Sequence, residues 1–262
     1  MRSTIQNNIV RAFFILNAML FSMYIKLHAQ IVNVESARMQ SDTTGWMGGA
    51  KLSVTLNQSV ATVFGANAEA HLQFKTKSDK SLWLILGNYG FLKGGSVKYI
   101  SNRFIHLRYN YKVTSWLRWE VFTQLLNNLI TKIDTRFLAG TGPRFKIVKN
   151  NILRLYAASL VMYEHEKDAT TPVTSQNDIR SSSYVSFTYT PTANIEIIST
   201  TFYQPLFRNF KDYRLLNAID VRVKATKHYS MSIRWDYLYD QFPAGNSPKT
   251  TYSISSGVQF EF

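Results

Sequence analysis

Alternation of apolar and polar residues over long stretches is the feature that most constrains this 262-residue chain. In residues 229–240 every odd position holds an apolar or aromatic side chain, and the even positions are mostly Ser, Arg or Asp. The same period recurs, with few exceptions, in residues 105–113, 214–224 and 251–262. A period of two predicts a β-strand with one apolar and one polar face. Because globular strands usually have about five or six residues and membrane-crossing strands about 9 to 11, these runs favour a membrane protein.

Carried through the chain, the pattern predicts an all-β fold, a transmembrane antiparallel up-and-down β-barrel. Its twelve strands are expected near residues 46–57, 66–76, 81–92, 99–112, 116–126, 135–148, 152–165, 180–190, 195–206, 214–225, 229–240 and 251–262. An even number of strands brings both ends of the chain to the same side of the membrane. Short connections, such as residues 113–115 and 226–228, alternate with longer ones, such as 166–179, 207–213 and 241–250. This alternation indicates short periplasmic turns and longer extracellular loops.

Aromatic residues supply a second test of the barrel. On the predicted outward face they gather near both ends of the strands, with Trp116 and Tyr229 at one end and Tyr89 and Tyr163 at the other. Amphipathic rings favour the headgroup level of a membrane, so two aromatic girdles are expected. The alternative is a soluble β-sandwich or barrel with an aromatic core, which would need a polar outer face and differently closed edges. The third strand fits worst, because residues 82–86 make both of its faces apolar.

Residues 1–29 predict a signal peptide, with Arg2 and Arg11 in a basic start, an apolar stretch at 12–25 and Ala29 before the cleavage point. An uncleaved anchor helix is the alternative, but the apolar stretch is too short to cross roughly 30 Å of hydrocarbon at about 1.5 Å per residue. Cleavage removes three basic residues, so the net charge falls from +14 to +11. Because an exported protein leaves the compartment that holds nucleic acid, nucleic acid is not an expected partner.

The end of the chain looks like a sorting signal. Phe262 closes an alternating run that includes Tyr252, Val258 and Phe260, as in the C-terminal assembly signal of Gram-negative outer-membrane barrels. Five further segments carry a resemblance to a known family: Asp42–Trp46, Leu107–Asn110, Arg118–Gln124, Arg136–Arg144 and Lys249–Tyr252. As an ordered set they resemble a domain-of-unknown-function family known as salt-induced outer-membrane proteins, in a form typical of Bacteroidota. The resemblance covers nearly all of residues 31–262. It implies a barrel of unassigned activity, with the barrel-assembly machinery, outer-membrane lipid and lipopolysaccharide as partners.

Motifs for catalysis, cofactors and metals are missing, so we predict no enzyme, no cofactor and no metal site. The chain has no cysteine, which excludes disulfides, thiol catalysis and cysteine-ligated metals. Gly140 and Gly142 lack the third glycine of a dinucleotide loop and lie in a predicted strand. The alternative is a lipid hydrolase in which His165 activates Ser181 or Ser183 on the lipid-facing wall, although serines are also expected at a polar rim.

Charged residues concentrate on the predicted inward face. The lumen-facing cluster comprises Arg108, Arg118, Glu120, Arg136, Arg144, Arg154, Arg222 and Arg234. One function is a closed barrel that supports envelope integrity, its lumen filled by ion pairs, because buried charges must be paired. The other is a narrow, anion-leaning, porin-like pore in which unpaired arginines lower the barrier for carboxylates or phosphates. The sequence does not identify a solute.

Residues 30–45 precede the predicted barrel, which spans residues 46–262. We assign them as a short periplasmic N-terminal segment, with the alternative that they fold into the lumen and plug it. If every inward arginine is paired, carboxylates beyond those nearby must come from Glu69, from Glu196 or from Glu35 and Asp42 of this segment.

Overall fold

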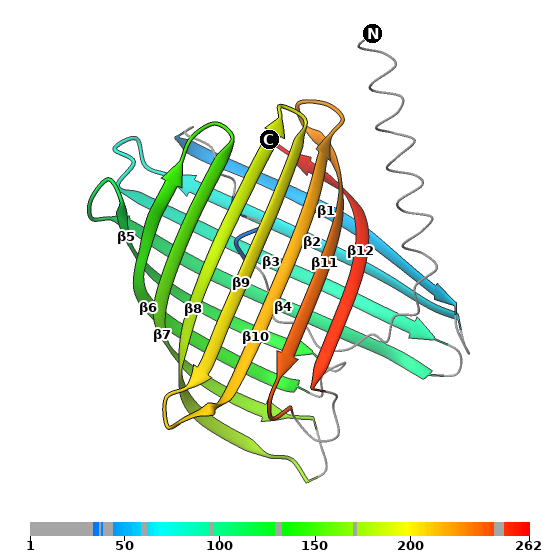
Figure 1. Ribbon diagram of the computed structural model, residues 1–262. Helices are drawn as coiled ribbons and strands as arrows, with labels where there is room; N and C mark the ends of the chain where they lie inside the picture. Colours follow the sequence, from blue (N-terminus) through cyan, green and yellow to red (C-terminus); the bar gives the residue numbers. More distant parts are fainter. Residues whose placement is uncertain are drawn as a thin grey trace.

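The computed structural model describes residues 34–36, 38, 44–58, 62–94, 97–128, 133–169, 172–243 and 249–262. Each strand pairs with its neighbour in the sequence, and β1 pairs with β12, so the sheet is a closed antiparallel barrel (Figure 1). The strands are β1 (Gly45–Gln58), β2 (Thr62–Lys75), β3 (Ser81–Gly94), β4 (Val97–Lys112), β5 (Leu117–Asn128), β6 (Ile133–Lys149), β7 (Leu153–Asp168), β8 (Ser175–Thr192), β9 (Ile195–Leu206), β10 (Asn209–Lys224), β11 (Tyr229–Asp240) and β12 (Thr250–Glu261). The predicted fold class is confirmed. The predicted signal peptide lies outside the described residues.

The connections at the predicted extracellular end are shorter than expected. β8 begins at Ser175 and β10 at Asn209, so the β9–β10 connection is a turn at Phe207 and Arg208 rather than a loop over residues 207–213. Strand residues that extend beyond the lipid have no apolar environment to face, so their side chains need not alternate. The alternating pattern therefore underestimates the length of the strands at this end. In the described part of the chain, no helix is long and apolar enough to cross a membrane.

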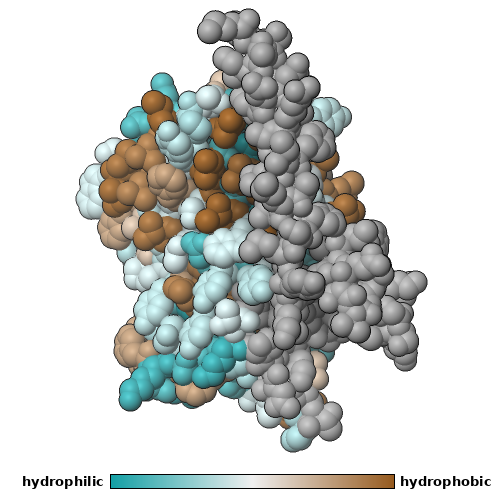
Figure 2. Space-filling view, turned by 45° about the vertical axis from the view of Figure 1, so that its right-hand side comes forward, coloured by the Kyte–Doolittle hydropathy of each residue, from teal (hydrophilic) through white to brown (hydrophobic). Residues whose placement is uncertain are grey.

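The two faces of the wall follow the predicted alternation. On β11, Met231 is 42% exposed to the outside, whereas Ser232 is 1% exposed and points into the barrel. Figure 2 shows apolar side chains gathered mainly on the upper part of the visible outer wall, with more polar ones below. Aromatic residues stand near both ends of the wall, including Trp116, which stacks on Phe145 with ring centres 6.0 Å apart. An apolar outer face with aromatic ends is what a membrane-spanning barrel requires.

The lumen contains an apolar layer that the alternation did not predict. Its buried residues are Phe122, Leu138, Ala158, Leu160, Met162, Tyr184, Phe202, Leu216 and Leu238. A second cluster joins Leu84 and Leu86 of β3 to Phe104, Leu126 and Val34. This second cluster explains why both faces of β3 are apolar, since its inward leucines pack against other apolar residues inside the barrel. The described lumen is therefore packed like a protein core and is not lined throughout by polar groups.

Candidate functional site in the barrel lumen

A short piece of the N-terminal segment lies inside the barrel. Val34, Glu35, Ser36 and Arg38 are all buried, and this blue stretch runs between the front and back strands in Figure 1. These four residues lie in the lumen, where its charged and apolar side chains hold them. They follow the alternative expected for residues 30–45, a segment folded into the lumen, and not the predicted periplasmic location. Most of the remainder of that segment, Asp42 included, lies outside the described residues.

The Glu35 carboxylate is shared by three guanidinium groups. Its Oε1 lies 2.9 Å from Arg108 Nη1 and 3.1 Å from Arg38 Nη2, and its Oε2 lies 3.0 Å from Arg144 Nη2. Burial alone would raise the pKa of Glu35, but the charges of these arginines outweigh it and lower the pKa to about 2. Glu35, which belongs to no strand, is thus an anion held by β4 and β6.

Glu120 of β5 completes this cluster from the wall. Its Oε1 lies 2.9 Å from Arg38 Nη2, and its Oε2 lies 3.3 Å from Arg108 Nη1. The Tyr184 hydroxyl donates a hydrogen bond of 2.7 Å to the same Oε2. Glu120 is fully buried. We call Glu35, Arg38, Arg108, Glu120 and Arg144 the central charge cluster, in which two carboxylates face three guanidinium groups.

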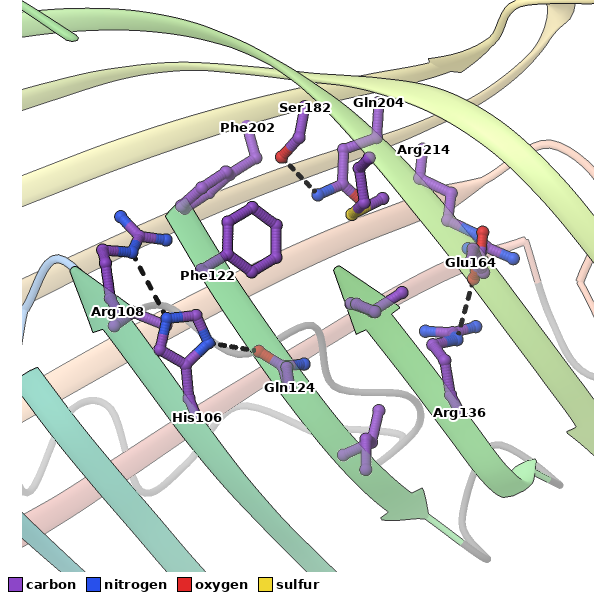
Figure 3. Close-up of a pocket in the computed structure, with 14 residues that line it drawn as sticks. His106, Arg108, Phe122, Gln124, Arg136, Glu164, Ser182, Phe202, Gln204 and Arg214 are labelled. Carbon is purple, nitrogen blue, oxygen red and sulfur yellow. Dashed lines mark hydrogen bonds and ion pairs between the residues drawn. The ribbon is translucent and has the colours of Figure 1, made fainter. Parts of the chain in front are cut away.

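Contacts within the wall hold both wall arginines of the central charge cluster. The Arg144 guanidinium lies 3.8 Å from the centre of the Tyr156 ring, and Arg144 Nε donates to the Tyr184 hydroxyl at 3.1 Å. Arg108 Nε lies 3.3 Å from His106 Nε2 (Figure 3). Because arginine can only donate, this nitrogen accepts, and His106 Nδ1 carries the proton that it donates to Gln124 at 3.0 Å. The positions of both arginines are therefore fixed by more than Glu35.

The opposite wall holds the same segment through the backbone carbonyl and the hydroxyl group of Ser36. Arg222 of β10 donates to the Ser36 carbonyl oxygen at 3.0 Å, and Arg234 of β11 donates to the Ser36 hydroxyl at 3.3 Å. In a ring of twelve strands, β11 stands opposite β5, which carries Glu120. The segment therefore bridges the two walls of the barrel.

A second network, the outer charge cluster, lies nearer the predicted extracellular end. Glu164 of β7 accepts from Arg180 Nε at 2.8 Å and from Arg214 Nη1 at 2.5 Å, and its Oε1 lies 3.0 Å from Arg136 Nε. Glu166 Oε2 lies 2.5 Å from Arg136 Nη2. All five side chains are buried. The central and outer charge clusters thus both lie in the described lumen, together with the apolar layer.

The predicted lumen residues fall into three groups. Arg108, Glu120 and Arg144 meet in the central charge cluster, Arg136 belongs to the outer charge cluster, and Arg222 and Arg234 hold Ser36. The structure does not bring Arg118 and Arg154 to these clusters, because both lie near the short turns. Arg118 pairs with Asp79 at 3.2 Å, and Arg154 lies 4.0 Å from Glu196.

Asp79 and Tyr184 were not predicted as part of the site. Asp79 has a φ of 54° in the β2–β3 turn. Burial alone would raise its pKa, but hydrogen bonds from Lys112 and Lys75 and the charge of Arg118 hold that pKa below its usual range. The sequence held one signal for this turn: Asp79 stands among the lysines at positions 75, 77 and 80, and a fourth lysine follows at position 112. Tyr184 gave no signal, since an inward tyrosine in the alternation differs in no way from other inward residues.

A small cavity lies between the two charge clusters. Its volume is about 30 Å³, and side chains from both clusters line it, including Arg108, Arg136, Glu164 and Arg214 (Figure 3). This is space for on the order of two water molecules. Among the described residues, no group of three or more His, Asp or Glu side chains is placed to bind a metal ion.

The pair of residues considered for lipid hydrolysis does not meet. His165 Nδ1 lies 2.7 Å from Asn177 Oδ1, while Ser181 and Ser183 hydrogen-bond to each other at 3.0 Å. The β7–β8 register pairs His165 with Asn177 and Val161 with Ser181. This offset of four residues separates histidine from serine by roughly 13 Å along the strands, at about 3.3 Å per residue.

The C-terminal residues close the barrel. Phe262 N donates to Gly48 O at 2.9 Å, and Gly48 N donates to Phe262 O at 3.2 Å. Tyr252, Val258, Phe260 and Phe262 are between 38% and 61% exposed on the outer face. Val258, Phe260 and Phe262 therefore form the seam with β1, whereas Tyr252 pairs with Tyr237 of β11. The role of all four residues as an assembly signal stays a prediction.

Comparisons with known proteins agree with the barrel. A model of the family described as "Protein of unknown function, DUF481" matches residues 41–262. No curated protein sequence matches the chain. Among solved structures, the NanC porin has a TM-score of 0.53 at 12% identity, covering 81% of this chain and 98% of that one. An outer-membrane channel from Pseudomonas putida F1 has a TM-score of 0.51 at 8% identity, covering 89% and 100%. The translocator domain of the autotransporter NalP from Neisseria meningitidis has a TM-score of 0.51 at 9% identity, covering 84% and 88%. At these identities the likeness establishes the fold alone.

Proposed function

This chain belongs to the DUF481 family of unknown function, and on that premise we propose that it is a closed outer-membrane barrel that supports envelope integrity. One observation carries the proposal: Glu35, Ser36 and Arg38 bridge the lumen, with charged side chains of β4 to β6 on one side and of β10 and β11 on the other. A bridge of this kind blocks a solute path and ties opposite walls together.

The packing of the described lumen supports the same conclusion. The apolar layer and the two charge clusters leave a cavity of about 30 Å³ between the clusters, which is far below the roughly 300 Å³ of a small ligand pocket. Twelve strands fall between eight-stranded barrels, whose interiors side chains fill, and porins of sixteen or more strands with an aqueous channel. Here the N-terminal segment supplies part of the filling.

Planar-bilayer recording tests this function. We expect the purified full-length protein to produce no stepwise conductance in 1 M KCl, and cells that lack it to become sensitive to detergents and bulky antibiotics while their uptake of small solutes is unchanged. Reproducible conductance steps of the wild-type protein would contradict a closed barrel. Normal detergent resistance of the deletion strain would contradict the role in envelope integrity.

A narrow, anion-leaning pore is the second candidate function. One observation favours it: part of the negative charge that neutralises Arg108 and Arg144 comes from Glu35, which is not a wall residue. A wall without this segment carries arginines in excess at its centre, and such a surface attracts anions. The lipid hydrolase has less support, because His165 contacts Asn177 and not a serine. The prediction that the chain is not an enzyme stays a prediction.

The partners and expression implied by the resemblance complete the proposal. The apolar outer wall fits a lipid environment, and we propose lipopolysaccharide on its extracellular half and recognition of the β12 end by the barrel-assembly machinery. From the name of the family that the chain resembles, we further propose that its expression increases with salt, and transcript measurements across a salt series would check this.

A further inference from the structure

We propose that Arg108 and Arg144 form a binding site for a small aliphatic carboxylate, which the Glu35 side chain fills in the described structure. This inference goes beyond the closed-barrel function, because a barrel that never conducts can still bind a carboxylate in its lumen.

The geometry is that of a bridged carboxylate. Arg108 on β4 and Arg144 on β6 flank β5, and each donates to a different oxygen of Glu35, at 2.9 and 3.0 Å. Charge-assisted bonds of this length are the strong ones, and two of them from separate strands fix both the position and the plane of the carboxylate. A free carboxylate presents the same two oxygens, so the same pair of donors suits it.

The site persists without Glu35, because the wall positions both arginines. Arg144 stacks on Tyr156 and bonds to Tyr184, and Arg108 contacts His106 and Glu120. Both guanidinium groups are almost fully buried. A ligand that replaces Glu35 therefore meets donors that are already oriented and largely desolvated, which reduces the entropy lost on binding.

Charge determines the class of ligand. Without the Glu35 carboxylate, three guanidinium groups, those of Arg38, Arg108 and Arg144, face the single carboxylate of Glu120, so the central charge cluster carries two unbalanced positive charges. A buried guanidinium without a partner is costly, so a carboxylate is favoured over a neutral amide of the same shape. Leu84, Leu86 and Phe104 pack around neighbouring Val34, which places an apolar surface close to the site and favours an aliphatic acid.

The test uses full-length protein reconstituted in lipid vesicles. Glu35→Gly removes the whole CH2–CH2–COO− side chain, and propionate matches the lost atoms one for one, with propionamide as its neutral counterpart. Titration calorimetry should show propionate binding to Glu35→Gly at least tenfold more tightly than propionamide. Glu35→Gln keeps the space filled, so propionate should bind neither to it nor to wild type. Equal binding of propionate and propionamide to Glu35→Gly, or none of either, would overturn the proposal.

A second substitution separates the site from general ionic effects. Adding Arg144→Gln to Glu35→Gly should abolish propionate binding, whereas adding Arg154→Gln, which lies near the short turns, should leave it unchanged. Loss with both, or with neither, would indicate an adventitious ion only and would contradict the site. If Glu35→Gly does not fold in buffer, the two ligands are added during refolding: recovery with propionate alone supports the site, and failure with both contradicts it. Bilayer conductance of wild type judges the closed-barrel function separately.

Discussion

Replacing Glu120 by glutamine removes one of the two carboxylates that neutralise the central charge cluster. The Glu120 carboxylate is fully buried and contacts Arg38 at 2.9 Å and Arg108 at 3.3 Å, with Arg144 at 3.6 Å. Glutamine retains a carbonyl oxygen for the Tyr184 hydroxyl, so the shape and one hydrogen bond survive. Three guanidinium groups then share the charge of Glu35 alone. Breaking a buried ion pair by removing one partner costs about 3–5 kcal/mol, and we expect a loss of this size.

Unfolding of the reconstituted barrel in urea measures the effect, with the heat-dependent gel shift of folded barrels as a second readout. Asp134→Asn is the matched control, because Asp134 pairs with Lys167 at 3.2 Å and both side chains are at least 42% exposed. Exposed pairs contribute about 0–1 kcal/mol. A loss of 3–5 kcal/mol corresponds to a fall in the melting temperature of roughly 6–20 °C for a chain of this size.

The outcome that would refute this reasoning is a Glu120→Gln barrel that unfolds like the Asp134→Asn control. Such a result would mean that water reaches the central charge cluster and screens it. If the same variant also conducted anions, the closed-barrel function would fail. A strongly destabilised variant without conductance would instead count against the pore.

Three further predictions follow from the seam, the outer wall and Glu35. Deleting Val258–Phe262 should abolish membrane insertion, because these residues form the β1–β12 seam, whereas shortening the 169–174 connection should not; a heat-dependent gel shift of membrane fractions checks both. Val221→Arg, on the lipid face, should destabilise by roughly 2–4 kcal/mol if it lies at the midplane, against about 0–1 kcal/mol for Ile152→Arg in the β6–β7 turn, as measured by urea unfolding. Lowering the pH from 5 to 2 should reduce the unfolding free energy of wild type more than that of Glu35→Gln: a carboxyl whose pKa falls from 4.5 to about 2 on folding stabilises above pH 4.5 and loses that contribution as the pH falls through 2. Equal pH slopes would contradict the Glu35 contacts.

The wall was predictable from the sequence because lipid imposes it residue by residue. Met231 must face hydrocarbon and Ser232 must not, so the period of two reports the fold directly. The prediction became less accurate where lipid no longer acts, as at residues 175–179, which extend β8 without alternation. The strand number and the seam at Phe262 follow from the same constraint.

The contents of the lumen were only partly predictable, because parity gives the face of a residue and not its partner. Glu120 was correctly placed among the arginines, and Glu35 was one of several candidate acids, but nothing local distinguishes it from Glu69 or Glu196. Its contact with Arg144 spans 109 residues. The apolar layer was missed because leucine and methionine at inward positions, such as Leu160 and Met162, read as interruptions of a pattern and not as a core.

For a wall of twelve strands, a pore and a closed barrel are hard to separate. An eight-stranded wall can fill its own lumen with side chains, and a sixteen-stranded wall cannot. Here the apolar layer fills part of the lumen, while Glu35 and Arg38 enter the central charge cluster from outside the wall and pair with Arg108, Glu120 and Arg144. The wall is thus complementary to a segment that it does not itself contain. Whether this barrel passes anions therefore depends on how strongly its walls bind that segment, which makes the ion pairs of Glu35 the contacts that separate one function from the other.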